Sequence, residues 1–321
     1  MSNVIFNPQQ TNHFNFSSKK TNSASAKTEE YSSPELVKIR DGDTPALICI
    51  DGFLTKGTDT SQEWLAGLPC RYATRAVYVL RWDSKNIEDF SALLDLVTDY
   101  KNFDPIMYAT SHGWHGIVQQ DRFFYAESDN GDSWLSKVYE PWQKARDNAR
   151  NTGMWLAFQI QNMASEDRDA INAKSFVLLG HSLGARVIYY CLDALRTLSQ
   201  TDQRLSNAIA QVYLFGGAVG HSANAGSVYN DGGVSNTVNW HGFNHLLKGQ
   251  INNYYSDRDN VLKYLFLAAE NLNETYDDTP NEEPIGLNPI INFSVRNHDV
   301  SHYVPGHTQY KENLYSIMSL V

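Results

Sequence analysis

Residues 176–185 limit the fold of this 321-residue chain more than any other segment. An apolar run typical of a buried strand leads into the pattern Gly-x-Ser-x-Gly at residues 180–184, and an amphipathic helical pattern follows at once. A chain that passes from strand to helix without a loop must reverse sharply, and Gly180 and Gly184 leave room for the backbones to pass closely. This pattern predicts a nucleophile elbow with Ser182 at the tip of a strained turn.

The remaining chain alternates short apolar runs with helical patterns. Such alternation implies βαβ units and a mostly parallel sheet with helices on both faces. Together with the elbow, it predicts the α/β-hydrolase fold. Strands are expected at residues 46–50, 76–80, 175–179, 211–215, 250–255 and 290–295. Helices are expected at residues 87–100, 183–198, 261–269 and 311–321, and one or two helices at residues 133–164.

Composition divides the chain into a tail and one domain. Residues 1–32 are rich in Asn, Ser, Thr, Gln and Lys, which predicts a disordered tail. Residues 33–321 have enough apolar material for a single catalytic domain. Within it, residues 103–132 begin with a stretch rich in aromatic side chains. This insertion is interpreted either as a cap with an apolar inner face or as a peripheral satellite core.

Charge and apolar patterning narrow the classes of partner. The formal net charge of −10 disfavours binding to nucleic acid or to anionic membrane surfaces. No apolar run is long enough for a membrane span, and the residues after Met1 lack the apolar region of a signal peptide. We therefore expect a soluble, cytoplasmic protein with no transmembrane segment. Secretion by a signal-independent route and the oligomeric state stay open.

Backbone N–H groups near the elbow are candidates for stabilising an oxyanion. The N–H of Leu183 begins the helix after the serine, where the helix dipole favours negative charge. A second donor is expected from the loop after an earlier strand. Gly52 lets the chain turn toward the site after the strand at residues 46–50, so Phe53 or Leu54 is expected to donate. The alternative is an ordinary turn at a strand end.

Two aspartates qualify as the acid of a catalytic triad. Such an acid belongs on the loop just past a strand end, and both Asp257 and Asp259 follow the strand at residues 250–255. Asp259 is preferred because it directly precedes the next expected helix.

Three histidines follow the acid, as the chain order of this fold requires. His298 comes three residues after the expected strand end at Val295, which leaves little chain to reach the serine. His307 is preferred because it follows the turn dipeptide Pro-Gly and opens a final helix that would anchor it. His302 remains the second choice.

The remaining motifs give no reason to expect a metal or cofactor. His112 and His115 are spaced as a pair of metal ligands, but they lie in an irregular aromatic stretch with no obvious third ligand. Asp257 and Asp259 lack the other positions of a calcium loop. No phosphate-binding loop or dinucleotide fingerprint is present. The predicted site therefore contains neither a metal nor a cofactor.

Beyond the elbow, the order and spacing of many short motifs over residues 45–320 resemble a known family. It is the α/β-hydrolase family, long described as a domain of unknown function, that includes the eukaryotic transmembrane and coiled-coil domain-containing proteins. The motifs are residues 52–57 with Trp64, residues 80–82 with Ser84 and Lys85, Pro141 and Trp142, Ala145, Arg150, Gly153, Leu156 and Ala157, residues 180–188, 214–218, 255–262, 285–287 and 299–301, and Gly306 and His307 with Tyr310.

The resemblance implies a catalytic domain with a Ser-Asp-His triad but supplies no substrate. It places Asp259 before a Val-Leu pair and His307 in a Gly-His-x-x-Tyr context. This chain departs from the membrane-attached relatives because it has no transmembrane segment and no long helical N-terminal region, so membrane anchoring is not expected.

Taken together, these features predict a serine hydrolase that cleaves a carboxylic ester. A lipid ester is favoured because the aromatic insertion and the helical pattern at residues 133–164 could cover an apolar acyl pocket. The alternative is a non-catalytic protein that keeps the fold for binding or interaction.

Overall fold

A computed structural model describes residues 33–53, 55–84, 134–165, 175–220, 240–266, 283–292 and 294–320. The chain divides into two units, Met1–Tyr31 and Ser32–Val321, and the structure described below belongs to the second. The predicted tail, the helix expected at residues 87–100, the insertion at 103–132 with His112 and His115, and Leu54 lie outside the described residues.

A seven-stranded sheet in the described residues has the strand order β1-β3-β2-β4-β5-β6-β7. Strands β2 to β7 run parallel, and β1 pairs antiparallel with β3 at one edge. Because these strands run parallel, the carboxyl ends of β2, β4, β5, β6 and β7 lie at the same edge of the sheet. The strands are β1 (Glu35–Arg40), β2 (Asp43–Ile50), β3 (Arg75–Arg81), β4 (Phe176–His181), β5 (Ile209–Phe215), β6 (Ile251–Tyr255) and β7 (Val295–Asp299).

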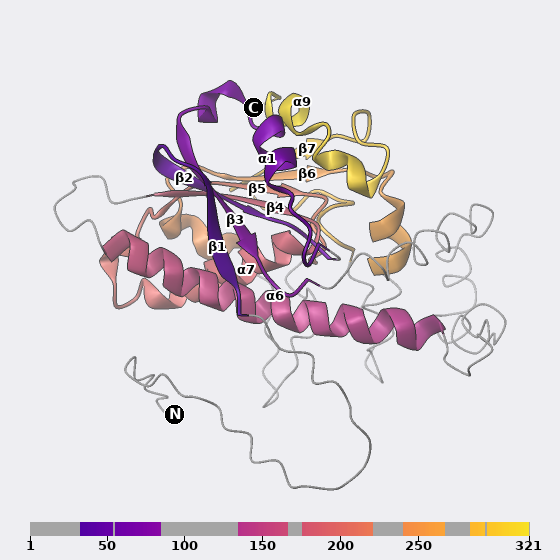
Figure 1. Ribbon diagram of the computed structural model, residues 1–321, viewed down its shortest axis with the longest axis horizontal. Helices are drawn as coiled ribbons and strands as arrows, with labels where there is room; N and C mark the ends of the chain where they lie inside the picture. The colour runs from indigo at the N-terminus through magenta and orange to yellow at the C-terminus, as the bar shows by residue number, and fades with distance from the viewer. Residues whose placement is uncertain are drawn as a thin grey trace, which may run out of the picture. The chain divides into compact units, whose positions relative to one another are not determined.

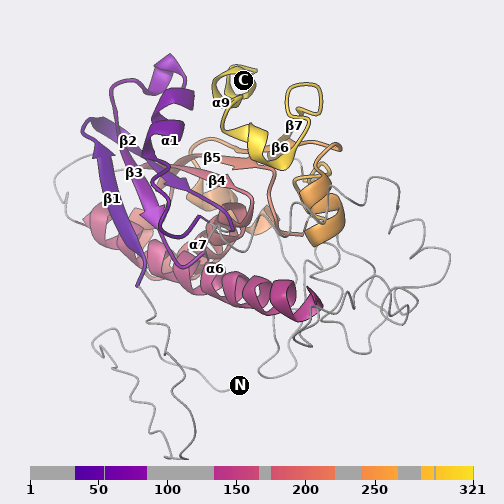
Figure 2. The same cartoon turned by 45° about the vertical axis from the view of Figure 1, so that its right-hand side comes forward.

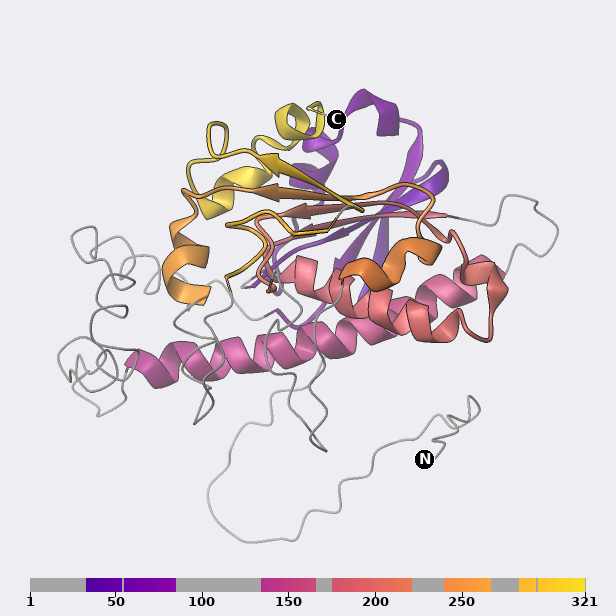
Figure 3. The same cartoon turned by 180° about the vertical axis from the view of Figure 1, so that it is seen from behind.

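Helices cover both faces of this sheet (Figure 1). The long helix α6 (Trp134–Ser165) and α7 (Leu183–Leu198) lie on one face, which Figure 3 shows from behind. The short helices α1 (Ser61–Gly67) and α9 (Leu314–Met318) lie together on the other face (Figure 2). The shorter helical turns are η1 (Cys70–Tyr72), η3 (Gln203–Leu205), η4 (Trp240–Leu246), the π-helical turn η5 (Val261–Phe266) and η6 (His307–Tyr310).

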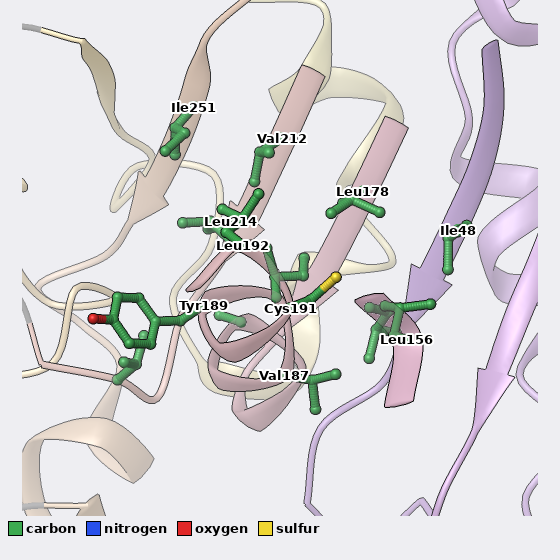
Figure 4. Packing of buried hydrophobic residues seen from close by; sticks show 14 of the residues in the cluster. Ile48, Leu156, Leu178, Val187, Tyr189, Cys191, Leu192, Val212, Leu214 and Ile251 are labelled. Atoms are coloured by element: carbon green, nitrogen blue, oxygen red, sulfur yellow. The ribbon is translucent and has the colours of Figure 1, made fainter. Parts of the chain in front are cut away.

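Residues 176–179 of strand β4 are all apolar because both faces of the strand are covered. Phe176 and Leu178 pack in the core under α6 and α7, whereas Val177 and Leu179 pack in the core under α1 and α9. Successive side chains of a strand point to opposite faces, so a strand that is covered on both sides must be apolar at every position. Figure 4 shows the first of these cores, where Leu178 faces the residues of α7.

These features confirm the predicted α/β-hydrolase fold, a mostly parallel sheet with helices on both faces. The structure also confirms the helix expected at residues 183–198, and the helix expected at 133–164 is the single helix α6. Among the described helices, none combines the length and apolar character that a membrane span requires.

The prediction of a strand at residues 290–295 is wrong. Strand β7 begins at Val295, where the expected strand ends, and His298 therefore lies inside a strand rather than beyond one. The side chain of Asn297 explains the difference, because it accepts from the N–H of Ile290 (2.8 Å) and donates to its carbonyl (2.9 Å). These bonds fold the apolar stretch into a turn that buries Ile290 and leaves Ile291 exposed.

Smaller departures concern short or polar elements. Strand β1 and helix α1 were not expected. Strand β1 mixes apolar with charged residues at the antiparallel edge of the sheet, and α1 has only seven residues. The final helix is shorter than expected, since residues 311–313 form a turn before α9.

Candidate active site

Ser182 occupies the turn between β4 and α7 in a backbone conformation that L-residues rarely adopt. Its φ and ψ angles are 55° and −122°. Such strain costs on the order of 1–3 kcal/mol and persists only where the surroundings hold it. Three hydrogen bonds of 3.0 Å do so here: the N–H of Ser182 donates to the carbonyl of Phe215, and its carbonyl accepts from Ala185 and Ala218.

The two glycines of the elbow are required by close approach of backbones. A Cβ on Gly180 would lie 2.8 Å from the carbonyl carbon of Gly184. A Cβ on Gly184 would overlap the carbonyl oxygen of Ile50 on the neighbouring strand. The Gly-x-Ser-x-Gly pattern thus allows the turn that presents Ser182 at the carboxyl edge of the sheet.

A continuous chain of hydrogen bonds joins Ser182, His307 and Asp259. The Oγ atom of Ser182 lies 2.8 Å from Nε2 of His307, and Nδ1 of His307 lies 2.6 Å from Oδ2 of Asp259. All three side chains are buried, with exposed fractions of 5%, 8% and 0% for Ser182, His307 and Asp259. A carboxylate only accepts, so Nδ1 carries the proton and Nε2 is left to accept from the serine hydroxyl.

The alternative acid and bases lie apart from this chain. Asp257 is exposed, and its backbone N–H donates to Oγ of Ser301. His302 is also exposed. His298 stacks on Tyr254 and donates to Oδ1 of Asn252 at 3.3 Å. Of the candidates named from the sequence, the structure therefore brings Asp259 and His307 to Ser182.

The loop after β2 reaches Ser182 as the oxyanion prediction requires. A Cβ on Gly52 would lie 2.5 Å from Cβ and 3.0 Å from Oγ of Ser182, so only glycine fits there. Phe53 follows and is half-buried, and Leu183 is the fully buried first residue of α7. These positions bring the backbone next to Ser182 from two sides, and the donor roles stay predictions.

For the ester hydrolase that the sequence predicts, replacing Gly52 by alanine is expected to lower turnover by about 100-fold, the order of loss for a misplaced reacting group. The new methyl group would push the Ser182 side chain out of hydrogen-bond range of His307. Gly306→Ala is the matched control, because a Cβ there meets only the end of the Gln309 side chain at 3.7 Å. Steady-state kinetics on an activated ester would compare the two variants, and equal activity would contradict the packing argument.

Residues outside the predicted triad and oxyanion positions fix the loop after β2. The carboxylate of Asp51 is buried, and it accepts from Oγ1 of Thr60 (2.5 Å) and Nε1 of Trp64 (3.1 Å). It also pairs with Nζ of Lys311 at 2.9 Å. Because Lys311 follows His307 by four residues, this ion pair connects the loop of Gly52 to the segment of the histidine. No local signal could reveal it, since 260 positions separate the two residues.

His181, inside the elbow motif itself, also contacts the histidine segment. Its Nε2 lies 3.0 Å from the backbone carbonyl of His307, which can only accept, so His181 donates. Burial lowers the pKa of His181 well below its usual value, and the neighbouring His307 and Lys311 lower it further. A neutral His181 thus holds the backbone that carries His307.

A cavity of about 570 Å³ opens beside Ser182 and His307. Aromatic rings pack edge to face along one side, with centroids 5.5 Å apart for Phe53 and Trp142 and 5.9 Å for Trp142 and Phe266. The described residues contain no cluster of His, Cys, Asp and Glu side chains suited to hold a metal ion. The arrangement places a hydrogen-bonded serine hydroxyl and histidine at the edge of a cavity with aromatic side chains along one side.

Comparison with solved structures finds distant likenesses. A type II thioesterase from the yersiniabactin biosynthetic pathway, YbtT, is 11% identical with a TM-score of 0.38, over 89% of this chain and 95% of that one. The alpha/beta hydrolase domain-containing protein 10 from mouse is also 11% identical, with a TM-score of 0.33 over 91% and 93% of the chains. These scores are too low to bear on the activity of this chain.

Comparison of sequences finds two relatives and a family. The chain is 28% identical over 185 residues to the "uncharacterized membrane protein C6F6.13c" of Schizosaccharomyces pombe, covering 57% of this chain and 20% of that protein. It is 25% identical over 189 residues to the "uncharacterized membrane protein F35D11.3" of Caenorhabditis elegans, covering 58% and 25%. The chain thus spans at most a quarter of the length of these relatives. The family model described as "Protein of unknown function (DUF726)" matches residues 133–321, more than half of the chain, and the chain belongs to this family.

Proposed function

We propose that this chain is a serine hydrolase that cleaves carboxylic esters through an acyl-enzyme. The observation that carries the proposal is the buried series of hydrogen bonds from Ser182 through His307 to Asp259, at the edge of a cavity. A serine hydroxyl is a weak nucleophile until a base removes its proton, and a neutral imidazole at 2.8 Å supplies such a base.

In the proposed mechanism, Oγ of Ser182 attacks the ester carbonyl while its proton passes to Nε2 of His307. The carboxylate of Asp259 orients the imidazole and stabilises the imidazolium that forms. The N–H groups of Leu183 and of Phe53 or Leu54 stabilise the negative oxygen of the tetrahedral intermediate. His307 then returns the proton to the departing alcohol. Water next attacks the acyl-enzyme while Nε2 of His307 accepts its proton. His307 passes this proton to Oγ of Ser182 as the bond between Oγ and the acyl carbon breaks and the acid leaves.

The site contains supports that would hold this geometry through the reaction. His181 fixes the backbone of His307, and the pair of Asp51 and Lys311 links the oxyanion loop to the same segment. Preorganised donors and bases cost no rearrangement at the moment of reaction.

The direct test is labelling of the full chain with a fluorophosphonate, which reacts with activated serines. We expect one covalent adduct, located at Ser182 by peptide mass spectrometry. A folded wild-type protein that neither labels nor cleaves activated esters would contradict the proposal and favour a binding role for the fold.

A hydrophobic acyl group is the proposed substrate class, because Phe53, Trp142 and Phe266 line one side of the cavity. Burial of each methylene contributes about 0.8 kcal/mol, so a few extra methylenes should raise kcat/KM at least about tenfold. We expect p-nitrophenyl octanoate to exceed p-nitrophenyl acetate by that factor. The leaving group is constant in this series, and equal or faster cleavage of the acetate would contradict an apolar acyl site.

A further inference from the structure

The cavity beside Ser182 has two walls of opposite character. One wall is apolar and is formed by Phe53, Trp142, Ala218, Val261, Leu262 and Phe266. The other wall, called the hydrophilic wall below, comes from the loop after β2, from α1 and from the segment after His307. Its polar side chains are those of Thr55, Thr58, Thr60, Glu63, Thr308, Lys311 and Glu312, and Ala66, Gly67 and Tyr315 complete it. The apolar wall belongs to the side of the sheet that α6 and α7 cover, and α1 and the segment before α9 belong to the other side. Ser182, at the sheet edge, lines the same cavity, so an ester bound there can extend one part along each wall.

The only ammonium on the described hydrophilic wall is already paired. Nζ of Lys311 lies 2.9 Å from Oδ1 of Asp51 and 2.5 Å from Oε2 of Glu63. Burial acts to lower the pKa of Lys311, but the two carboxylates outweigh burial and raise it, so the side chain stays charged. The group formed by Asp51, Glu63 and Lys311 therefore carries a formal net charge of −1.

Negative charge therefore exceeds positive charge along the described part of this wall. The carboxylates of Glu63 and Glu312 line it and Asp51 lies directly behind it, against the single ammonium of Lys311. Arg186 contributes a positive charge on the other side, where its guanidinium donates to the carbonyl of Ala218 behind the apolar wall. A ligand group on the hydrophilic wall thus meets a net negative field.

We propose that Glu63 and Glu312 make the cavity select esters with a neutral or cationic alcohol over esters whose alcohol carries a sulfonate, phosphate or carboxylate. This inference rests on the proposed function, with the acyl chain on the apolar wall and the alcohol on the hydrophilic wall. Two unit charges a few ångströms apart near a protein surface interact strongly enough to change an affinity by about tenfold, and salt weakens the interaction.

The test uses three esters of octanoic acid. Their alcohols are similar in size and differ in charge. The alcohols are choline, its neutral isostere 3,3-dimethylbutanol, and 2-hydroxyethanesulfonate, and each rate is divided by the rate of alkaline hydrolysis of that ester. For the wild-type full chain at low salt, we expect kcat/KM for the choline ester to exceed that for the sulfonate ester by about tenfold or more. The ratio should fall toward one in 0.5 M salt, since the Debye length then drops to roughly 4 Å.

Charge variants identify the residues responsible. Glu312 is exposed, so Glu312→Gln should fold normally and lower the cation-to-anion ratio about threefold, and Glu312→Lys should lower it further. Glu63→Gln should act in the same direction. The double variant Asp41→Asn/Asp193→Asn is the matched control for Glu63→Gln/Glu312→Gln, because both control residues are at least two-fifths exposed and lie outside the cavity lining.

The outcomes separate this inference from the proposed function. Cleavage of the neutral ester without any preference between the charged esters would overturn the inference and leave the serine hydrolase intact. A wild-type preference that is unchanged in Glu312→Lys and in Glu63→Gln/Glu312→Gln would also overturn the inference and leave the serine hydrolase intact. Failure to cleave any of the three esters, together with absent fluorophosphonate labelling, would overturn both.

Discussion

Ser182→Ala is expected to lower the turnover of an activated ester by about 10⁵- to 10⁶-fold, with the fold unchanged. The substitution removes the only nucleophilic atom within 2.8 Å of Nε2 of His307 among the described residues, and it leaves the backbone of the elbow in place. The residual rate would come from binding and from oxyanion stabilisation alone. Stopped-flow or steady-state assays on p-nitrophenyl octanoate would measure the loss.

The same substitution should abolish fluorophosphonate labelling. Ser316→Ala is the matched control, because Ser316 is an exposed serine on α9 and should label and turn over as the wild type does. Circular dichroism and the unfolding temperature of both variants should match the wild type. Labelling that persists in a folded Ser182→Ala protein would place the nucleophile elsewhere.

The fold was predictable where local sequence determines structure. The Gly-x-Ser-x-Gly segment demands a strand before it and a helix after it, and the apolar spacing of residues 183–198 set the bounds of α7. Prediction failed at residues 290–295, where an apolar run suggested a strand. There the side chain of Asn297 bonds both backbone groups of Ile290, and apolar periodicity carries no information about such a bond.

The site divides in the same way between local and distant effects. Ser182 was identifiable because its own neighbours impose the turn. Asp257 and Asp259 both follow β6 and differ by two positions, and the sequence favoured Asp259 by its place before the next helix. The folded loop leaves Asp257 exposed and buries Asp259 fully. Ser256 contributes to that loop by donating to the carbonyl of Val304 at 2.7 Å, which joins it to the segment that carries the histidine.

The supports of the site were not predictable from local pattern. The contact of Asp51 with Lys311 spans 260 positions, and that of His181 with the backbone of His307 spans 126. Each contact forms only because the folded sheet brings the carboxyl ends of β2 and β4 next to the segment that contains His307 and Lys311. Chemistry-bearing residues far apart in sequence thus meet at one edge because the parallel topology aligns all its strand ends there.

His307 and Asp259 should matter to turnover nearly as much as Ser182 itself. His307→Ala should lower turnover as much as Ser182→Ala, and the double variant should be no worse than either, because the members of a triad act as a unit. Asp259→Asn should cost about 10⁴-fold, since an amide would favour the wrong tautomer of the imidazole that now lies 2.6 Å from the carboxylate.

The neighbouring residues supply matched controls for both positions. Asp257→Asn and His302→Ala change exposed side chains of the same types in the same loops, and both should stay within a few-fold of the wild type. Single-turnover rates with an activated ester isolate the chemical step from product release. A crippled Asp257→Asn protein beside an active Asp259→Asn protein would reassign the acid. A dead His302→Ala protein beside an active His307→Ala protein would reassign the base, and either result would mean that the buried hydrogen bonds to Ser182 do not carry the reaction.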